Sequence, residues 1–493
     1  MSTALDPGFD VAALMARLGV VPPRITADSR DVRPGDAFAA YPGAVADGRA
    51  FIGDALGRGA GAVFWEPGGF RWNDGWQVPA EAVPQLRERL SAIAAFVFGH
   101  PSQALWTIGV TGTNGKTSCT HWIAQCLERC GRPAGVLGTL GNGRVGALAP
   151  ARHTTADAAG LQEVLAELRR TGAEAVAMEV SSHGLDQGRV NAVAFDVALF
   201  TNLTRDHLDY HGTMEAYGAA KARLFRWPGL VSSVLNADDA FGARLAAEAR
   251  RQGRACMTYG QAAADIRASA VVADAQGIRC TVDTPDGRGE LAAPVVGSFN
   301  LANVLGCLGV LLASGVALPA ALAALREIEP PAGRMQRLGG GEAPLVVVDY
   351  AHTPDALEKV LLALRPAVAP GGALACVFGG GGDRDAGKRP AMGRIAARLA
   401  DRAVVTSDNP RSEDPAAIAE AIVAGIEAAG AVDWEVELDR GVAIAAAVAG
   451  ARRGDVVLIA GKGHETTQEA RGTRVRFSDA EVATAALAVW RSR

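Results

Sequence analysis

The sequence predicts an α/β protein with three domains: a small mixed α/β N-terminal domain, a central domain with a parallel or mixed sheet like that of P-loop ATPases, and a C-terminal Rossmann-like domain. The length of 493 residues exceeds the roughly 250–300 residues at which a single core stops growing. Two series of apolar strand-like segments alternate with Ala/Leu-rich helical segments, which is typical of a mostly parallel sheet covered by helices. A glycine-rich turn joins a strand to a helix near residue 112.

The first domain is expected to span residues 1–103. Its predicted strands are ITADSR, DAFAAYPG and AGAVFWE, and a helix is expected to end at AIAAFVFG. HPSQAL follows and is predicted to be a linker.

The central domain is expected over residues 104–335 and the C-terminal domain over 336–493. The central strands are predicted at WTIGVTG, EAVAMEVSS, VALFTNLT and SSVLNADD, with a helix around HWIAQCLERC. The C-terminal strands are predicted at PLVVVDY, ALACVFGGGG, RAVVTSDNP and DVVLIAGKG. Ligands bind at the carboxyl ends of the strands in such sheets.

The composition is that of a globular enzyme, with 49% apolar and 21% charged residues. A net charge of −4 without a Lys/Arg run argues against nucleic acid or an anionic membrane as a partner. The seven cysteines lack CxxC or zinc spacing, which favours reduced thiols in the cytosol. Because there is no signal-like N-terminus and no long apolar stretch, we expect a cytoplasmic protein outside the membrane, and we expect a monomer.

The run TIGVTGTNGKTS has the strand, glycine-rich turn and helix of a nucleotide phosphate loop. Gly112 and Gly115 let backbone amides approach phosphates, Lys116 supplies positive charge, and Thr117 can ligate magnesium at the helix N-terminus. The strict GxxxxGK[ST] spacing would need glycine at Val110, so the loop is a variant.

Charged and polar side chains follow the next strands. Glu179 ends a predicted strand and can complete a magnesium site with Thr117. His207, His211 and Lys221 follow the strand after it. The two histidines could instead bind zinc, but turn residues follow them and they are not expected to share a helix, which disfavours this alternative.

The motifs GTNGKTS, EVSSHGLDQGR, TNLTRDHLDYHG, GSFNLANVLG, RMQRL, DYAHTPDAL, GGGGDRDAGKRPAMG, DNPR and GKGHE occur in this order across residues 110–469. Together with TADSR, they identify the chain as resembling the Mur ligase family, in its branch that adds diaminopimelate or lysine to UDP-N-acetylmuramoyl-L-alanyl-D-glutamate. The resemblance covers nearly the whole chain. It implies the cofactors ATP and Mg2+, and a carbamate formed on Lys221 from CO2.

The resemblance also implies the roles of individual residues. Lys116, Glu179, His207 and Lys221 are the expected catalytic residues, and the last three join Thr117 as metal ligands. ATP would contact the loop and four residues beyond it, in the full set Gly112, Thr113, Asn114, Gly115, Lys116, Thr117, Ser118, Asn300, Arg334, Asp349 and His352.

The UDP-muramoyl dipeptide would be held by the first two domains. Its expected contacts are Ala27, Ser29, Ala44, Val45, Ala46, His153, Thr154, Thr155, Ser181, Gln187 and Arg189. His153 stands where the family commonly has asparagine, and Ala27 offers only backbone or a methyl group.

The incoming amino acid, meso-diaminopimelate, would be held by Arg384, Asp408, Asn409, Pro410, Arg411, Gly461 and Glu465. Arg411 can grip a distal carboxylate through a bidentate fork, which lysine would leave empty. Glu465 would take the distal ammonium. Without the resemblance, DNPR is also an ordinary Asx-Pro turn.

We therefore predict amide-bond formation through an acyl phosphate of the D-glutamate carboxylate, in peptidoglycan precursor synthesis. The alternatives are a lysine-adding or D-alanyl-D-alanine-adding Mur ligase, a folylpolyglutamate synthetase, or a nucleotide-switched binding protein. Product formation separates the last of these from the ligases.

Overall fold

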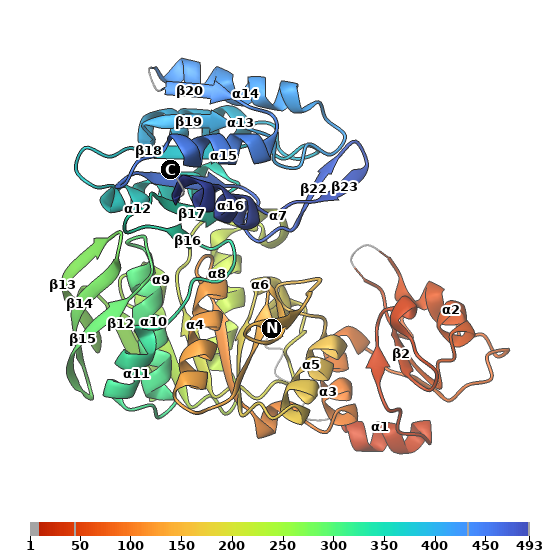
Figure 1. Ribbon diagram of the computed structural model, residues 1–493. Coiled ribbons are helices and arrows are strands. Elements are labelled where there is room, and N and C mark those ends of the chain that lie inside the picture. Colours follow the sequence, from red (N-terminus) through yellow and green to blue (C-terminus); the bar gives the residue numbers. More distant parts are fainter. Residues whose placement is uncertain (1–8, 44–45, 431–432, 492–493) are drawn as a thin grey trace. The chain divides into compact units, whose positions relative to one another are not determined.

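The structure is a computed structural model that describes residues 9–43, 46–430 and 433–491. These residues form two compact units. One unit comprises the chain up to Arg267 with Asp283–Gly287 and Leu305–Ala324, and the other comprises Ala268–Val282, Arg288–Val304 and Leu325–Arg493. Three main sheets with helices between their strands confirm the predicted α/β class (Figure 1).

The N-terminal sheet has four parallel strands in the order β1-β2-β3-β4. Apolar residues on its two faces form separate core clusters. The elements here are α1 (Val11–Leu18), β1 (Ile25–Thr26), η1 (Ser29–Asp31), β2 (Ala37–Ala40), η2 (Gly48–Phe51), α2 (Ile52–Gly57), β3 (Ala62–Trp65), β4 (Ala80–Ala82) and α3 (Leu86–Val97).

The structure corrects one local prediction for this region and adds detail to a second. The segment ITADSR is a strand only at its start, because the Asp28 side chain accepts a hydrogen bond from the Arg30 amide and caps a short 3-10 helix. The segment HPSQAL is also a 3-10 helix, η3 (Pro101–Ala104), in which Pro101 and Ser102 are buried. It is therefore a packed connection.

The central sheet places β5 (Trp106–Thr111) between β9 (Ala175–Glu179) and β10 (Val197–Phe200), all parallel. Val110 pairs with Glu179, and Thr111 pairs with Phe200, so the three strands end at the same edge. The order continues through β11 (Ser232–Asn236) and β12 (Cys256–Gly260) on one side, and through β6 (Ala134–Gly138), β7 (Gly141–Arg144) and β8 (Ala147–Ala149) on the other.

The helices of this region lie between or after the strands in chain order (Figure 1). They are α4 (Lys116–Arg129), α5 (Ala158–Arg170), α6 (Ser182–Asp186), α7 (Leu208–His211), α8 (Met214–Ala222), η4 (Arg223–Arg226), α9 (Ala240–Arg251), α10 (Asn300–Ala313) and α11 (Leu318–Leu325).

Three further strands follow β12: β13 (Ile266–Asp274), β14 (Gly277–Thr284) and β15 (Gly287–Ala293). They were absent from the sequence expectation. The turns between them, DAQG and TPDG, carry the Asp and Gly residues that hairpins favour, with Gly277 and Gly287 at positive φ.

The C-terminal sheet has the order β16-β17-β21-β18-β19-β20, parallel except for β16. Alternate residues of β17 belong to the core clusters on its two faces. The elements are β16 (Gln336–Gly339), β17 (Leu345–Asp349), α12 (Pro354–Leu364), η5 (Arg365–Ala367), β18 (Leu374–Phe378), α13 (Lys388–Leu399), β19 (Arg402–Val405), α14 (Pro415–Ala429), β20 (Asp433–Val436), α15 (Arg440–Gly450), β21 (Val456–Ala460), β22 (Thr467–Ala470), β23 (Thr473–Arg476) and α16 (Asp479–Arg491).

Among the described helices, none has the length and apolar character needed to cross a membrane.

Candidate active site

The predicted phosphate loop lies between β5 and α4. Gly112 has a φ of 151°, and a Cβ atom there would lie 1.9 Å from the Thr201 hydroxyl oxygen. Gly115, with a φ of 85°, precedes the first residue of α4, Lys116. The Lys116 ammonium donates to the carbonyl oxygens of Gly112 and Thr113 at 3.0 and 2.9 Å. The glycines are therefore required by space and backbone conformation.

Residues after β10 hold this loop, although no role was predicted for them from the sequence. The Thr113 amide donates to the Asn202 carbonyl at 2.8 Å, and the Asn114 amide donates to the Asn202 side chain at 3.0 Å. The Thr201 hydroxyl donates to the Asn114 carbonyl at 2.6 Å. The signal was present in TNLT, because small polar residues directly after a parallel strand lie at the ligand-binding edge.

The Thr117 hydroxyl donates to Glu179 Oε1 at 3.0 Å. The same carboxylate oxygen accepts a 2.8 Å bond from the Thr139 amide, and Glu179 is only 1% exposed. A Cβ at Gly138 would lie 2.3 Å from Glu179 Oε1. The two predicted metal ligands are thus adjacent, and Ser118 lies half-buried one residue further along α4.

Lys221, on α8, is 1% exposed and donates to the Gly112 carbonyl at 2.8 Å. Its ammonium nitrogen lies 4.4 Å from the centre of the Tyr217 ring. Burial, together with the nearby charge of Lys116, holds the pKa of Lys221 well below its ordinary value. Lys221, the residue predicted to form a carbamate, thus contacts the phosphate loop directly.

Three histidines gather beside Lys221. The ring centre of His183 lies 4.9 Å from that of His207 and 5.4 Å from that of His211. His207 is the N-cap residue of α7 and has a left-handed backbone conformation, whereas His211 ends the helix, so the two histidines do not share a helix. Burial lowers the pKa of both His183 and His211. Within the described residues, no group of three His, Cys, Asp or Glu side chains is arranged to hold a metal.

Several predicted dipeptide contacts form one hydrogen-bonded group, in which Thr155, before α5, meets residues that follow β9. The Thr155 hydroxyl donates to the Glu179 carbonyl at 2.9 Å and accepts from the Ser181 amide at 2.9 Å. Arg189 donates to the Thr155 carbonyl at 2.7 Å and to Gln187 Oε1 at 2.6 Å. This group is continuous with the Glu179 site.

The other predicted dipeptide contacts lie outside this hydrogen-bonded group. Thr154 lies 3.0 Å from the Thr139 hydroxyl. Ala27 and Ser29 are half-buried, whereas His153 and Ala46 are exposed. The remaining two predicted contacts, Ala44 and Val45, lie outside the described residues.

In the second unit, the predicted nucleotide residues Asp349 and Arg334 lie near each other. The Asp349 carboxylate accepts bonds from the Met335 and Ala351 amides at 2.8 and 2.9 Å, and burial raises its pKa. The Arg334 guanidinium lies 4.9 Å from the Tyr350 ring centre, and its buried Nε has no hydrogen-bond partner.

The other two predicted nucleotide residues in this unit have local backbone partners. His352 is exposed, with Nδ1 2.8 Å from the Tyr350 carbonyl. Asn300 is 3% exposed and donates to the Val296 carbonyl at 2.7 Å.

The predicted amino-acid pocket is also in the second unit, at the carboxyl ends of β19 and β21. The side-chain amide nitrogen of Asn409, Nδ2, donates to Glu465 Oε2 at 2.7 Å. A Cβ at Gly461 would lie 2.4 Å from Asp408 Oδ2. Burial acts to raise the pKa of Glu465, but Lys462 and Asn409 hold this pKa below its ordinary value. Lys462 was not assigned a role by the sequence reasoning, although it belongs to the quoted motif GKGHE.

The loop after β18 borders this group. Arg411 has a positive φ of 50° and donates to the Gly382 carbonyl at 2.7 Å. A Cβ at Gly382 would lie 1.9 Å from the Pro410 carbonyl oxygen. Arg384 is exposed. The motifs GGGGDRDAGKRPAMG and DNPR are thus in direct contact.

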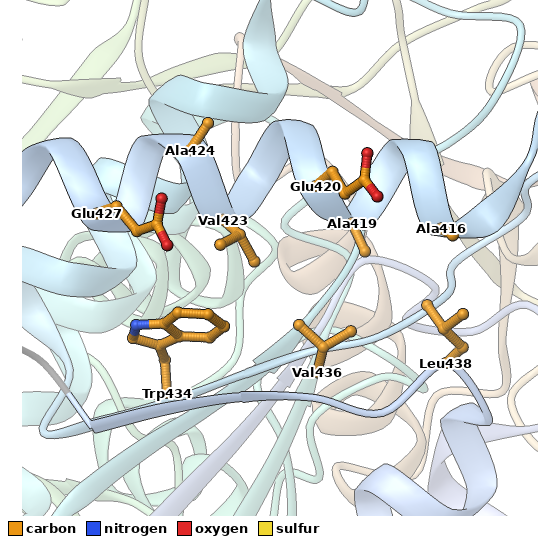
Figure 2. Close-up of a pocket in the computed structure, with 9 residues that line it drawn as sticks. All are labelled: Ala416, Ala419, Glu420, Val423, Ala424, Glu427, Trp434, Val436 and Leu438. Atoms are coloured by element: carbon orange, nitrogen blue, oxygen red, sulfur yellow. The ribbon is translucent and has the colours of Figure 1, made fainter.

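A different hollow lies between α14 and β20, with a volume of about 460 Å³. Figure 2 shows apolar side chains of α14 facing Trp434 and Val436 of β20, with Glu420 and Glu427 on the helix. None of the predicted site residues lines it.

Comparisons with known proteins identify relatives along nearly the whole chain. Three family models match the chain: "Mur ligase family, catalytic domain" over residues 24–97, "Mur ligase middle domain" over 110–311, and "Mur ligase, glutamate ligase domain" over 333–463.

Two similar curated relatives share one name, UDP-N-acetylmuramoyl-L-alanyl-D-glutamate--2,6-diaminopimelate ligase. The relative from Chromobacterium violaceum is 54% identical over 492 residues, covering 100% of this chain and 99% of the relative. The relative from Pseudomonas aeruginosa is 54% identical over 470 residues, covering 94% and 95%.

A solved structure described by the same enzyme name is 37% identical, covers 95% of both chains and has a TM-score of 0.71. A MurF ligase from Thermotoga maritima, solved with ADP, is 20% identical with a TM-score of 0.65 over 95% of this chain and 96% of its own. The second likeness shows the fold alone.

Proposed function

The chain belongs to the Mur ligase family, and from that premise we propose that it adds meso-2,6-diaminopimelate to the D-glutamate of UDP-N-acetylmuramoyl-L-alanyl-D-glutamate. The reaction is ATP-dependent amide-bond formation in cytoplasmic peptidoglycan precursor synthesis. The observation that carries this proposal is the 54% identity, over essentially the whole of both chains, to a relative named for this activity.

The phosphate loop is the proposed ATP site. Gly112, Thr113, Asn114, Gly115, Lys116, Thr117 and Ser118 lie at the N-terminus of α4, where backbone amides and the helix dipole favour phosphate. In the second unit, Asn300, Arg334, Asp349 and His352 are the proposed further nucleotide contacts. The unpaired buried Nε of Arg334 supports this, because a buried donor without a partner is costly unless a ligand satisfies it.

The oxygen atoms of Thr117 and Glu179 fit a magnesium ion. They are 3.0 Å apart beside the phosphate loop, and Mg2+ prefers carboxylate and hydroxyl oxygens together with substrate phosphates. When bound, the metal neutralises negative charge on the phosphates. His207 is proposed as a ligand of a second ion.

Lys221 fits carbamate formation. Its buried amine has a lowered pKa, so it is more readily present as the neutral nucleophile. The neutral nitrogen attacks the carbon of CO2, forms a C–N bond and releases one proton. The resulting anion supplies oxygen ligands where the free lysine has none.

The proposed chemistry needs no side-chain nucleophile. The D-glutamate carboxylate attacks the γ-phosphorus of ATP, giving an acyl phosphate and ADP, and the diaminopimelate amine then displaces phosphate from the acyl carbon and loses a proton. Lys116 stabilises the charge that develops on the transferred phosphoryl group.

The two substrates are proposed to occupy separate groups of residues. The dipeptide substrate is proposed to contact Ala27, Ser29, Ala44, Val45, Ala46, His153, Thr154, Thr155, Ser181, Gln187 and Arg189. The amino acid is proposed to contact Arg384, Asp408, Asn409, Pro410, Arg411, Gly461 and Glu465. We also propose the domain limits 1–103, 104–335 and 336–493, because each range contains one of the three main sheets.

The test is phosphate release by the purified protein with ATP, Mg2+ and the UDP-muramoyl dipeptide, comparing meso-diaminopimelate with L-lysine and identifying the product by mass. Stimulation by diaminopimelate with a tripeptide product is the expected result. A preference for lysine would transfer the chain to the lysine-adding branch, and no product with either amino acid would contradict the proposal.

A further inference from the structure

Lys462 is a completely buried lysine at the edge of the proposed amino-acid pocket. It follows β21 and Gly461, and it is 0% exposed. Its ammonium nitrogen lies 3.0 Å from Asn409 Oδ1 and 3.0 Å from Glu465 Oε2. Burying a charge is costly unless it is paired and hydrogen-bonded, so these contacts account for its place in the fold.

Lys462 and its neighbours determine the orientation of two proposed substrate-binding groups. The Asn409 side chain accepts from Lys462 and from the Glu469 amide through Oδ1, and donates from Nδ2 to Glu465. Its amide orientation is therefore set on both sides. Glu465 receives Lys462 and Asn409 on the same oxygen, Oε2, which leaves Oε1 for a ligand.

Lys462 also changes the charge that a ligand meets. An ion pair of Lys462 with Glu465 has no net charge, so the carboxylate attracts a lone ammonium less strongly than an unpaired one would. An amino-acid centre that carries both ammonium and carboxylate is itself neutral, and Arg411, two residues after Asn409 in the chain, supplies a guanidinium that can take the carboxylate.

Resting on the proposed function, we propose that Lys462 is a positioning residue that determines acceptor specificity. By neutralising and orienting Glu465, it makes the pocket select an acceptor whose far end is a zwitterionic amino-acid centre over one whose far end is a lone ammonium. Meso-diaminopimelate is an acceptor of the first kind, and L-lysine is one of the second.

The experiment compares kcat/KM for meso-diaminopimelate and L-lysine in two variants. One removes the positive charge of the ion pair and the other removes the negative charge. Lys462→Met leaves Glu465 as an uncompensated anion, so the diaminopimelate-to-lysine ratio is expected to fall at least about tenfold. Glu465→Gln leaves Lys462 as an uncompensated cation, so the ratio is expected to rise while kcat/KM for both acceptors falls. A merely structural lysine would not move the ratio in opposite directions in the two variants.

The controls separate this inference from the proposed function. Lys359→Met removes an exposed lysine of α12 that pairs with Asp355 and should leave the ratio unchanged. If Lys462→Met does not fold, Glu465→Gln decides, because that side chain is 32% exposed and glutamine keeps its shape. A wild-type protein that makes tripeptide, with a ratio within about twofold in the variants that fold, overturns the inference alone. A wild-type protein that makes no tripeptide overturns the proposed function.

Discussion

Lys221 and Lys462 are two buried lysines with opposite surroundings. Lys221 is 1% exposed and bonds to the carbonyl of Gly112, and within the described residues no carboxylate lies at ion-pair distance from it. Lys462 is 0% exposed and bonds to the Glu465 carboxylate. Burial therefore does not decide alone what a lysine does. The partner decides whether the positive charge of a buried lysine is compensated by a carboxylate.

The largest expected effect comes from removing the reactive amine. Lys221→Ala should lower kcat by about 10²–10³-fold, the usual cost of losing one group that stabilises transition-state charge. ATP binding should persist, because the phosphate loop keeps its glycines and Lys116. Tripeptide formation and ATP affinity measured side by side test this, and partial recovery of kcat by added acetate would support an anionic role at this position. Wild-type kcat in this variant would contradict the comparison.

Each region also has a glycine that no other residue can replace without strain. Gly112→Ala should destabilise the fold by about 1–3 kcal/mol and raise KM for ATP, because its Cβ would clash with Thr201. Gly461→Ala should raise KM for the amino acid through Asp408. The matched control is Gly131→Ala, which also has positive φ but nothing within 4 Å, and it should leave both KM values unchanged. A raised KM for the amino acid in Gly112→Ala, or a raised KM for ATP in Gly461→Ala, would contradict the assignment of the two regions.

The burial of Lys221 also predicts a pH dependence of stability. Its folded pKa lies well below the ordinary value of 10.5, so between these two values the unfolded chain binds more protons than the folded one. The free energy of unfolding therefore rises with pH in this window, by at most about 1.4 kcal/mol per pH unit from this group. In CO2-depleted buffer, chemical denaturation should show wild type gaining stability relative to Lys221→Met as pH rises. Parallel pH profiles would mean that Lys221 remains charged.

The smallest expected effect is at an exposed lysine. Lys359→Met breaks an i,i+4 pair with Asp355 in which both side chains are largely exposed, so the free energy of unfolding should change by only about 0.3–0.5 kcal/mol. Thermal unfolding measures this. If Lys359→Met changed the free energy of unfolding as much as substitution of a buried lysine does, the exposure of a lysine would be a poor guide to its contribution to stability in this protein.

Much of the fold and the phosphate loop could be predicted from local sequence. Strands such as LVVVD and VVLIA are continuous apolar runs because both faces of a parallel sheet are buried. The turn GTNGKTS is recognisable because glycine, lysine and threonine are each needed for phosphate binding. The strands β13 to β15 were missed because their polar, alternating residues give a weaker sequence signal than the Asp- and Gly-containing turns that join them.

The residue types at each strand end, and hence the class of chemistry, can be read from the sequence without a structure. The partners of these residues depend on the three-dimensional fold. Thr201 and Asn202 hold the phosphate loop, His183 gathers with His207 and His211, and Lys462 pairs with Glu465 and Asn409. Among the residues that the structure describes, Lys221 has no carboxylate partner of this kind. These contacts join residues on different strands and loops, many of them tens of residues apart in sequence. Local sequence carries no record of the burial and the neighbouring charge that set a side chain's protonation.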